Sequence, residues 1–161
     1  MRDIEAVASV AVDCGFHIHK ELGPGLLESV YETVLTAALL ERGLSVERQR
    51  PVPINFRGIV LNEGFRADIL VENSLIIEVK SVERNAPVHA KQLLTYLRLL
   101  QQPLGLLMNF GCETFRDGVK RVVNGHDNFA PSRLCVNQSD IGAATTLVDG
   151  DSAPMPPILG R

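Results

Sequence analysis

The sequence predicts one soluble α/β domain that extends from the N-terminus to about Val123. Two amphipathic helical patterns open the chain, and segments with strand-like apolar patterns follow them, with a further helix before the last strands. A chain of 161 residues with 45% hydrophobic content supports one core of ordinary size, and it is too short for two comfortable domains.

The first two elements are predicted as helices because their apolar residues recur at intervals of three and four. The first helix covers residues 4–22, and the segment Gly23-Pro24-Gly25 ends it because proline and glycine interrupt the helical hydrogen-bond ladder. The second helix covers residues 26–42, and Gly43 is well placed as its C-terminal cap.

The pattern then changes to the period of a strand. Pro51 and Pro53 interrupt the first strand, which therefore belongs at a sheet edge. The segment 56–58 is predicted to turn the chain, and the segment 72–74 to join two strands. The predicted elements, in order, are strands at 46–54, 59–61, 65–71 and 75–82, a helix at 87–100, a strand at 104–110 and a short element at 117–123.

Charge and composition separate the predicted domain, residues 1–123, from residues 124–161. The domain carries 14 Lys and Arg against 15 Asp and Glu, so most of the net charge of −3 belongs to the remainder. Residues 124–161 are rich in Gly, Pro, Ser, Asp and Asn, and we predict a low-order extension there. The near-neutral domain offers no broad basic surface, although a local basic strip would suffice for nucleic acid.

The chain is expected in the cytoplasm, without a membrane partner. The first residues are charged and lack the apolar run of a signal peptide, and no apolar stretch approaches the roughly 18 residues that span a bilayer. Cys14, Cys112 and Cys135 stand far apart without a CxxC pair, which indicates reduced thiols and argues against a zinc site. The sequence does not indicate an oligomeric state.

A candidate metal site lies on the predicted strand pair. Glu78 and Lys80 are two residues apart, so their side chains share one face of a strand. If residues 72–74 form a three-residue loop, Asp68 lies opposite Glu78, and two facing carboxylates are usually retained when a cation sits between them. Carboxylate oxygens favour Mg²⁺ or Mn²⁺. The alternatives are a two-residue loop, which would pair Asp68 with Val79, and a solvated strand face with an ordinary Glu–Lys pair.

Two helical pairs of polar residues accompany these strands. Glu28 and Tyr31 are three apart on the second helix, and Gln92 and Tyr96 are four apart on the helix after the strands. Residues at these spacings are neighbours on one helix face. Each pair alone is also consistent with a helix terminus or a half-buried polar edge.

Together these motifs resemble the GxxExxY protein family of the PD-(D/E)XK nuclease superfamily. Gly25, Glu28 and Tyr31 match the family motif; Asp68, Glu78 and Lys80 match the D…ExK core; Gln92 and Tyr96 match the QxxxY motif of RecB-like nucleases. The resemblance covers about three quarters of the chain, to Val123. It implies a restriction-endonuclease-like core, in which helices flank a central mixed sheet. Ala67 departs from the proline of the superfamily label.

The resemblance also implies roles for these residues. Asp68 and Glu78 would bind Mg²⁺ or Mn²⁺ with the backbone carbonyl of Val79, and Glu28 would act directly or through a bound water. Lys80 would position the attacking water. The remaining matched residues would support the site or contact the nucleic-acid backbone: Tyr31, Gln92 and Tyr96.

The leading hypothesis is therefore a metal-dependent nuclease that hydrolyses phosphodiester bonds in DNA, with RNA as the second candidate substrate. One alternative is a catalytically inactive module on the same fold that binds nucleic acid or another partner. A second alternative is a structural protein whose acidic cluster is simply hydrated. The step from superfamily to activity is an analogy.

Overall fold

A computed structural model describes residues 2–125 of the protein. The predicted extension therefore lies outside the described residues from position 126 onward. The elements are α1 (Ile4–Leu22), α2 (Glu28–Glu41), β1 (Val46–Phe56), β2 (Ile59–Val71), β3 (Leu75–Lys80), α3 (Pro87–Leu99), β4 (Leu104–Asn109), α4 (Phe115–Gly118) and β5 (Val119–Val123). No helix within residues 2–125 has both the length and the apolar character needed to cross a membrane.

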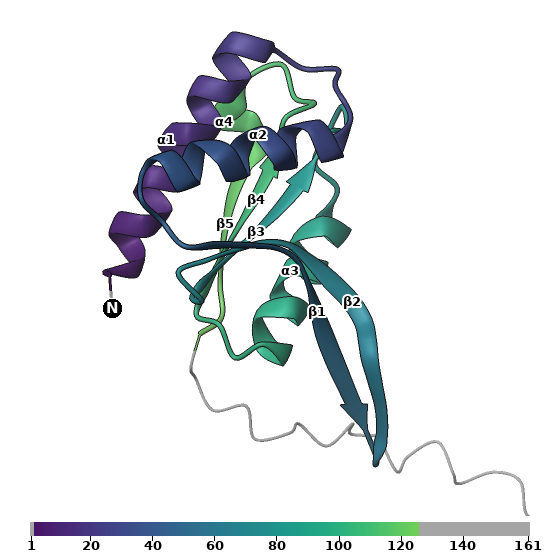
Figure 1. Ribbon diagram of the computed structural model, residues 1–161. Helices are drawn as coiled ribbons and strands as arrows, with labels where there is room; N and C mark the ends of the chain where they lie inside the picture. Colours follow the sequence, from purple (N-terminus) through teal and green to yellow (C-terminus); the bar gives the residue numbers. More distant parts are fainter. Residues whose placement is uncertain (1, 126–161) are drawn as a thin grey trace, which may run out of the picture. The chain divides into compact units, whose positions relative to one another are not determined.

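The strands form one mixed sheet with the order β1-β2-β3-β4-β5 (Figure 1). Strands β3 and β4 are parallel and are connected through α3, whereas the other neighbouring pairs are antiparallel. A parallel pair needs a crossover connection of this kind, while antiparallel pairs need only short turns. The predicted α/β class, with helices flanking a mixed sheet, is confirmed.

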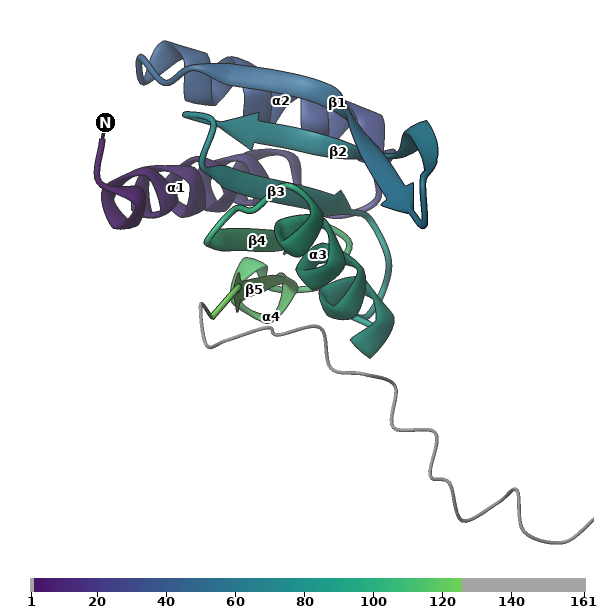
Figure 2. The same cartoon turned by 90° about the horizontal axis from the view of Figure 1, so that it is seen from below.

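Helices cover the two faces of the sheet and create two separate apolar clusters. Ile77 and Val79 of β3 pack with α1 and α2, whereas Ile76 packs on the opposite face with Leu93 and Leu97 of α3. Figure 2 shows α3 on its own side of the strands, apart from α1 and α2. The division follows from strand geometry, because successive side chains point to opposite faces of a sheet.

Strands β1 and β2 continue beyond the rest of the sheet as a two-stranded ribbon (Figure 1). The predicted edge position of β1 is confirmed, and the two short strands predicted at 59–61 and 65–71 are one continuous strand. The register between β1 and β2 shifts between Val52 and Ile54, next to Pro53, which has no N–H to donate. Gly64 makes room there for the Ile54 side chain, because a Cβ atom would lie 2.3 Å from it and would force it to move.

Several element ends differ from the sequence prediction for local reasons. Strand β3 ends at Lys80 because the side chain of Asn109 bonds both the N–H and the carbonyl of Val82, at 2.9 and 2.8 Å. The last predicted element begins as the short helix α4, where the Thr114 hydroxyl accepts a hydrogen bond from the Asp117 N–H. Helix α3 begins at Pro87 as predicted, and Gly43 follows α2 with a left-handed φ of 71°.

The turn between α1 and α2 is fixed by Tyr31. This residue is fully buried, and its ring stacks on Phe110 with centroids 4.5 Å apart. The Tyr31 hydroxyl donates to the Gly23 carbonyl at 2.6 Å and accepts the Leu26 N–H at 3.2 Å. Because the next residues of this turn lead into Glu28, Tyr31 determines where the first residue of α2 lies.

We predict that Tyr31→Phe lowers the free energy of unfolding by about 1–2 kcal/mol, because two part-buried backbone groups lose their partner. Chemical denaturation measures this change. Thr33→Val is the matched control on the same helix, since it removes an exposed hydroxyl bond to the Ser29 carbonyl and is expected to change stability little. Equal stability of Tyr31→Phe and wild type would contradict the prediction.

Candidate functional site

The hairpin of β2 and β3 brings Asp68 to Glu78. Val71 pairs with Leu75 and Ile69 with Ile77, so the loop has three residues, as predicted, and the pairing ends one residue before Asp68 and Glu78. The ladder stops after Ile69, where β2 departs from β3. Asp68 Oδ2 accepts a hydrogen bond from the Val79 N–H at 2.9 Å and so replaces the missing backbone partner.

The backbone of Val79 faces the same gap between β2 and β3. In a strand, the N–H and carbonyl of one residue point toward the same neighbouring strand. The Val79 N–H bonds Asp68, so its carbonyl is directed toward that side as well. The next carbonyl, of Lys80, points to the other side and accepts the Phe110 N–H at 2.7 Å.

Glu78 is the most deeply buried acid of the site. It is 3% exposed, and Lys80 Nζ lies 2.9 Å from its Oε1. Its Oε2 has no hydrogen-bond partner among the described residues. Buried polar atoms are normally satisfied, and an unpaired carboxylate oxygen is costly. An additional donor or a cation is therefore needed at Oε2 when Glu78 is ionised.

The pKa values of the site reflect this burial. Burial, and then the negative charge of Asp68, raise the pKa of Glu78 to about 7. Burial also raises the pKa of Asp68, although the bond from Val79 and the charge of Lys80 oppose the change. Burial lowers the pKa of Lys80, but its bond to Glu78 and its attraction to both acids outweigh this and leave it raised.

A cleft of about 540 Å³ opens beside the hairpin at the N-terminus of α2. Its lining includes Leu27, Glu28, Glu32, Gln49, Asp68 and Val79. Glu28, the first residue of α2, accepts the Ser81 N–H at 3.2 Å, and the Ser81 hydroxyl donates to the Leu26 carbonyl at 2.6 Å. The structure thus brings Glu28 and Asp68 to one cleft, while Glu78 and Lys80 do not line it.

Two site residues were not found from the sequence. Glu32, with a side chain 9% exposed, accepts hydrogen bonds from Arg48 Nε and Gln49 Nε2, both at 3.0 Å. The same Gln49 nitrogen lies 3.4 Å from Asp68 Oδ1. Glu32 follows Glu28 by four residues, so helical spacing alone would have placed both carboxylates on one face.

Gln92 and Tyr96 lie on α3, which packs on the sheet face of Ile76, the face that Glu78 shares by strand alternation. They bond each other through the Gln92 amide and the Tyr96 hydroxyl. The Tyr96 ring stacks on Phe65 of β2, with centroids 3.6 Å apart and planes at 9°. Burial, and then the negative charge of Glu78, raise the pKa of Tyr96, so its hydroxyl lies within electrostatic reach of the acids. Tyr31, in contrast, is enclosed by the core beneath the α1–α2 turn.

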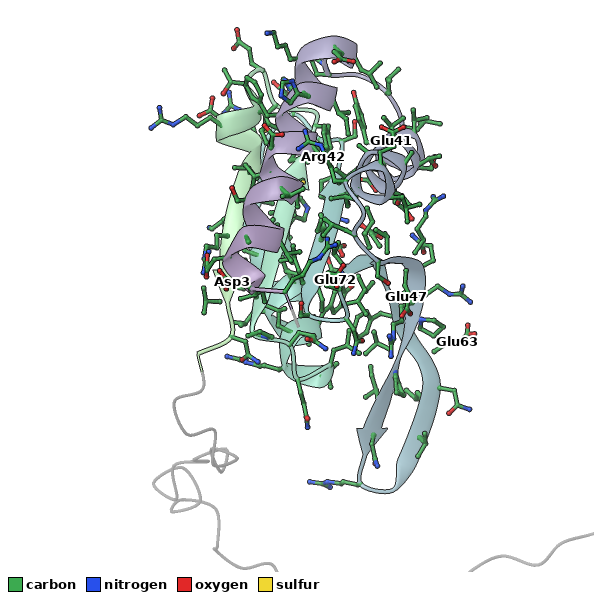
Figure 3. All side chains as sticks on the ribbon, turned by 60° about the vertical axis from the view of Figure 1, so that its left-hand side comes forward. Asp3, Glu41, Arg42, Glu47, Glu63 and Glu72 are labelled. Atoms are coloured by element: carbon green, nitrogen blue, oxygen red, sulfur yellow. The ribbon has the colours of Figure 1, made fainter. Side chains whose placement is uncertain are left out.

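Exposed acids on the ribbon are separate from this cluster. Figure 3 shows Glu47 and Glu63 on the β1–β2 ribbon. Glu47 pairs with Arg50 at 3.1 Å, and Glu63 pairs with Arg66 at 3.0 Å. Exposed pairs of this kind contribute little to stability. The electrostatics of the candidate site therefore depend on its buried residues.

The donor set fits a hard divalent cation. Within residues 2–125 no three His, Cys, Asp or Glu side chains converge into a complete metal cage. Mg²⁺ does not need one, since it is usually bound through one or two carboxylates and retains several waters. Asp68, Glu78 with its unpartnered Oε2, and the Val79 carbonyl supply such a partial set.

Comparison with known proteins agrees with this arrangement. Residues 5–122 match the family model described as PD-(D/E)XK nuclease superfamily, a group that is typically metal-dependent. Neither a curated protein nor a solved structure matches the chain significantly. The match covers α1 through nearly all of β5, including the hairpin with Asp68 and Glu78. The chain belongs to the PD-(D/E)XK nuclease superfamily.

Proposed function

We propose that the protein is a metal-dependent nuclease that hydrolyses phosphodiester bonds in DNA, with RNA as the second candidate substrate. The observation that carries the proposal is the buried Glu78 carboxylate, whose Oε2 has no hydrogen-bond partner among the described residues. Asp68 lies close to it, at the gap between β2 and β3. The resemblance of Gly25, Glu28 and Tyr31 to the GxxExxY motif supports a place in that family. A cytoplasmic location stays a prediction from the sequence.

In this proposal Asp68, Glu78 and the Val79 carbonyl would hold Mg²⁺ or Mn²⁺. The bound cation would polarise the scissile phosphate and lower the pKa of a coordinated water. Glu28 borders the same cleft as Asp68 and acts there directly or through a bound water. Its position in the first turn of α2 also allows the helix dipole to stabilise its negative charge.

Lys80 supplies the positive charge of the proposed active site. Its Nζ donates to Glu78 Oε1, and its side chain is 16% exposed, so the ammonium group is held near the acids without being fully enclosed. A cation held in this way orients a water molecule or stabilises negative charge that develops on the phosphate. Gln92 and Tyr96 support the acids from the α3 side of the sheet.

We expect Glu78→Gln and Lys80→Met each to lower nuclease activity by roughly 100-fold or more, because the first removes a carboxylate that would hold the cation and the second removes a positive charge that stabilises the transition state. The assay uses supercoiled plasmid, labelled single-stranded DNA and labelled RNA, with Mg²⁺ or Mn²⁺. Glu47→Gln is the matched control, since it alters an exposed acid of the ribbon that pairs with Arg50. Circular dichroism establishes that the variants are folded.

The outcomes of this assay separate the candidate functions. Cleavage that survives in folded Glu78→Gln would overturn the assignment of the site. Binding of DNA by the wild type without cleavage in either metal would favour an inactive binding module on the same fold. Cleavage of labelled RNA and of neither DNA substrate would make RNA the substrate in place of DNA.

The raised pKa of Glu78 predicts how metal-free stability depends on pH. Between pH 4.5 and about 7 the folded state retains a proton that the unfolded state releases. The free energy of unfolding therefore decreases as the pH rises through this window, by up to about 3 kcal/mol, and levels off above it. Urea denaturation with a chelator present measures this slope. Glu78→Gln should lack the same contribution, and identical slopes in the two proteins would contradict the assignment.

A further inference from the structure

Gln49 of β1 has an unusual backbone conformation. It lies on one side of β2, and β3 lies on the other. Arg48 pairs with Ile69 and Arg50 pairs with Ala67, so Gln49 falls opposite Asp68 in the β1–β2 register. No regular pair forms at that point, and Gln49 has a φ of 50°. A residue with a side chain rarely adopts this left-handed conformation within a strand, because its Cβ crowds the backbone. Such conformations persist when surrounding contacts impose them.

The contacts of the Gln49 side chain account for this conformation. Its Nε2 donates to Glu32 Oε2 at 3.0 Å and to Asp68 Oδ1 at 3.4 Å. A primary amide carries two N–H donors on one nitrogen, so one group can serve two carboxylates at once. If the amide were turned over, its carbonyl oxygen would face the carboxylates of Glu32 and Asp68. Three hydrogen-bond acceptors would then lie together without a donor between them. The two carboxylates therefore determine the orientation of the amide.

The amide holds Asp68 without cancelling its charge. Asp68 Oδ2 accepts the Val79 N–H and Oδ1 receives the Gln49 amide, so its two oxygens are held from opposite sides. A lysine or arginine at this position would compete with a cation for the carboxylate, whereas a neutral amide leaves its negative charge available.

The other end of this chain of contacts is fixed by an arginine. Glu32 is 7% exposed as a whole residue, and it also accepts a hydrogen bond from Arg48 Nε. The positive charge therefore lies at the far end, beyond Glu32 and away from Asp68. Arg48 holds Glu32, Glu32 orients the Gln49 amide, and the amide fixes Asp68.

We propose that Gln49 is a positioning residue, which keeps its strained backbone in order to hold the Asp68 carboxylate ready for a divalent cation. This inference rests on the proposed metal-dependent function. Polar partners of metal ligands typically alter metal affinity by roughly 10- to 100-fold when they are removed.

The test is Gln49→Gly, measured by chemical denaturation and by calorimetric titration with Mn²⁺. Glycine adopts a positive φ without strain, and this gain offsets the lost hydrogen bonds to Glu32 and Asp68, so we expect stability to change little while Mn²⁺ affinity falls roughly 10- to 100-fold. Gln101→Gly is the matched control, because Gln101 also has a left-handed φ, of 54°, and is exposed beyond α3, away from the site. Its Mn²⁺ affinity should equal that of the wild type. Glu78→Gln, titrated in parallel, identifies the Mn²⁺ binding that belongs to this site.

Each result decides the proposal. Wild-type Mn²⁺ affinity in Gln49→Gly would overturn the role of Gln49 while leaving the proposed function intact. Absence of Mn²⁺ binding that depends on Glu78 in the wild type would overturn both. A large loss of stability in Gln49→Gly would overturn the idea that strain is kept for the site. Gln49→Met retains the backbone cost but has no N–H donor, so it should lose Mn²⁺ affinity as well, and normal affinity there would also refute the proposal.

Discussion

The hydrogen bond from the Val79 N–H to the Asp68 carboxylate is the contact on which the site depends. Beyond the pair of Ile69 and Ile77, β2 leaves β3 and continues with β1 as a ribbon. This divergence opens a gap in the sheet and would leave the backbone of Val79 without a partner. Asp68 satisfies the N–H, and its carboxylate lies close enough to Glu78 for its charge to raise the pKa of that acid. One contact therefore both completes the sheet and brings the two acids together.

The distribution of charge around this gap explains its electrostatic character. Glu78 receives one bond from Lys80, and Glu32 receives its positive charge from Arg48, on the far side from Asp68. Between the acids the structure places neutral donors, a backbone N–H and the amide of Gln49. Such donors orient carboxylates without neutralising them. Burial, and then the negative charge of Asp68, raise the pKa of Glu78, and a divalent cation would stabilise its ionised form.

The structure confirms much of the predicted geometry and shows why the rest was missed. The three-residue loop and its register followed from the apolar alternation of two adjacent strands, which are close in sequence. Tyr31 shares a helix face with Glu28 by spacing, yet its ring enters the core and its hydroxyl fixes the preceding turn. Gln49 was missed because its reach to Asp68 requires a left-handed backbone, which no periodicity indicates for a glutamine.

The sequence by itself determined most of the helices and strands, the face shared by Glu78 and Lys80, and the three-residue loop between β2 and β3, because these depend on local alternation and on one short connection. Tertiary structure alone decided that the N-terminus of α2 lies over the hairpin, through the contact of Glu28 with Ser81, 53 residues away. It also decided that Glu32 and Gln49 meet at Asp68. These contacts join residues far apart in the chain, and packing of separate elements, which no local pattern encodes, sets their positions.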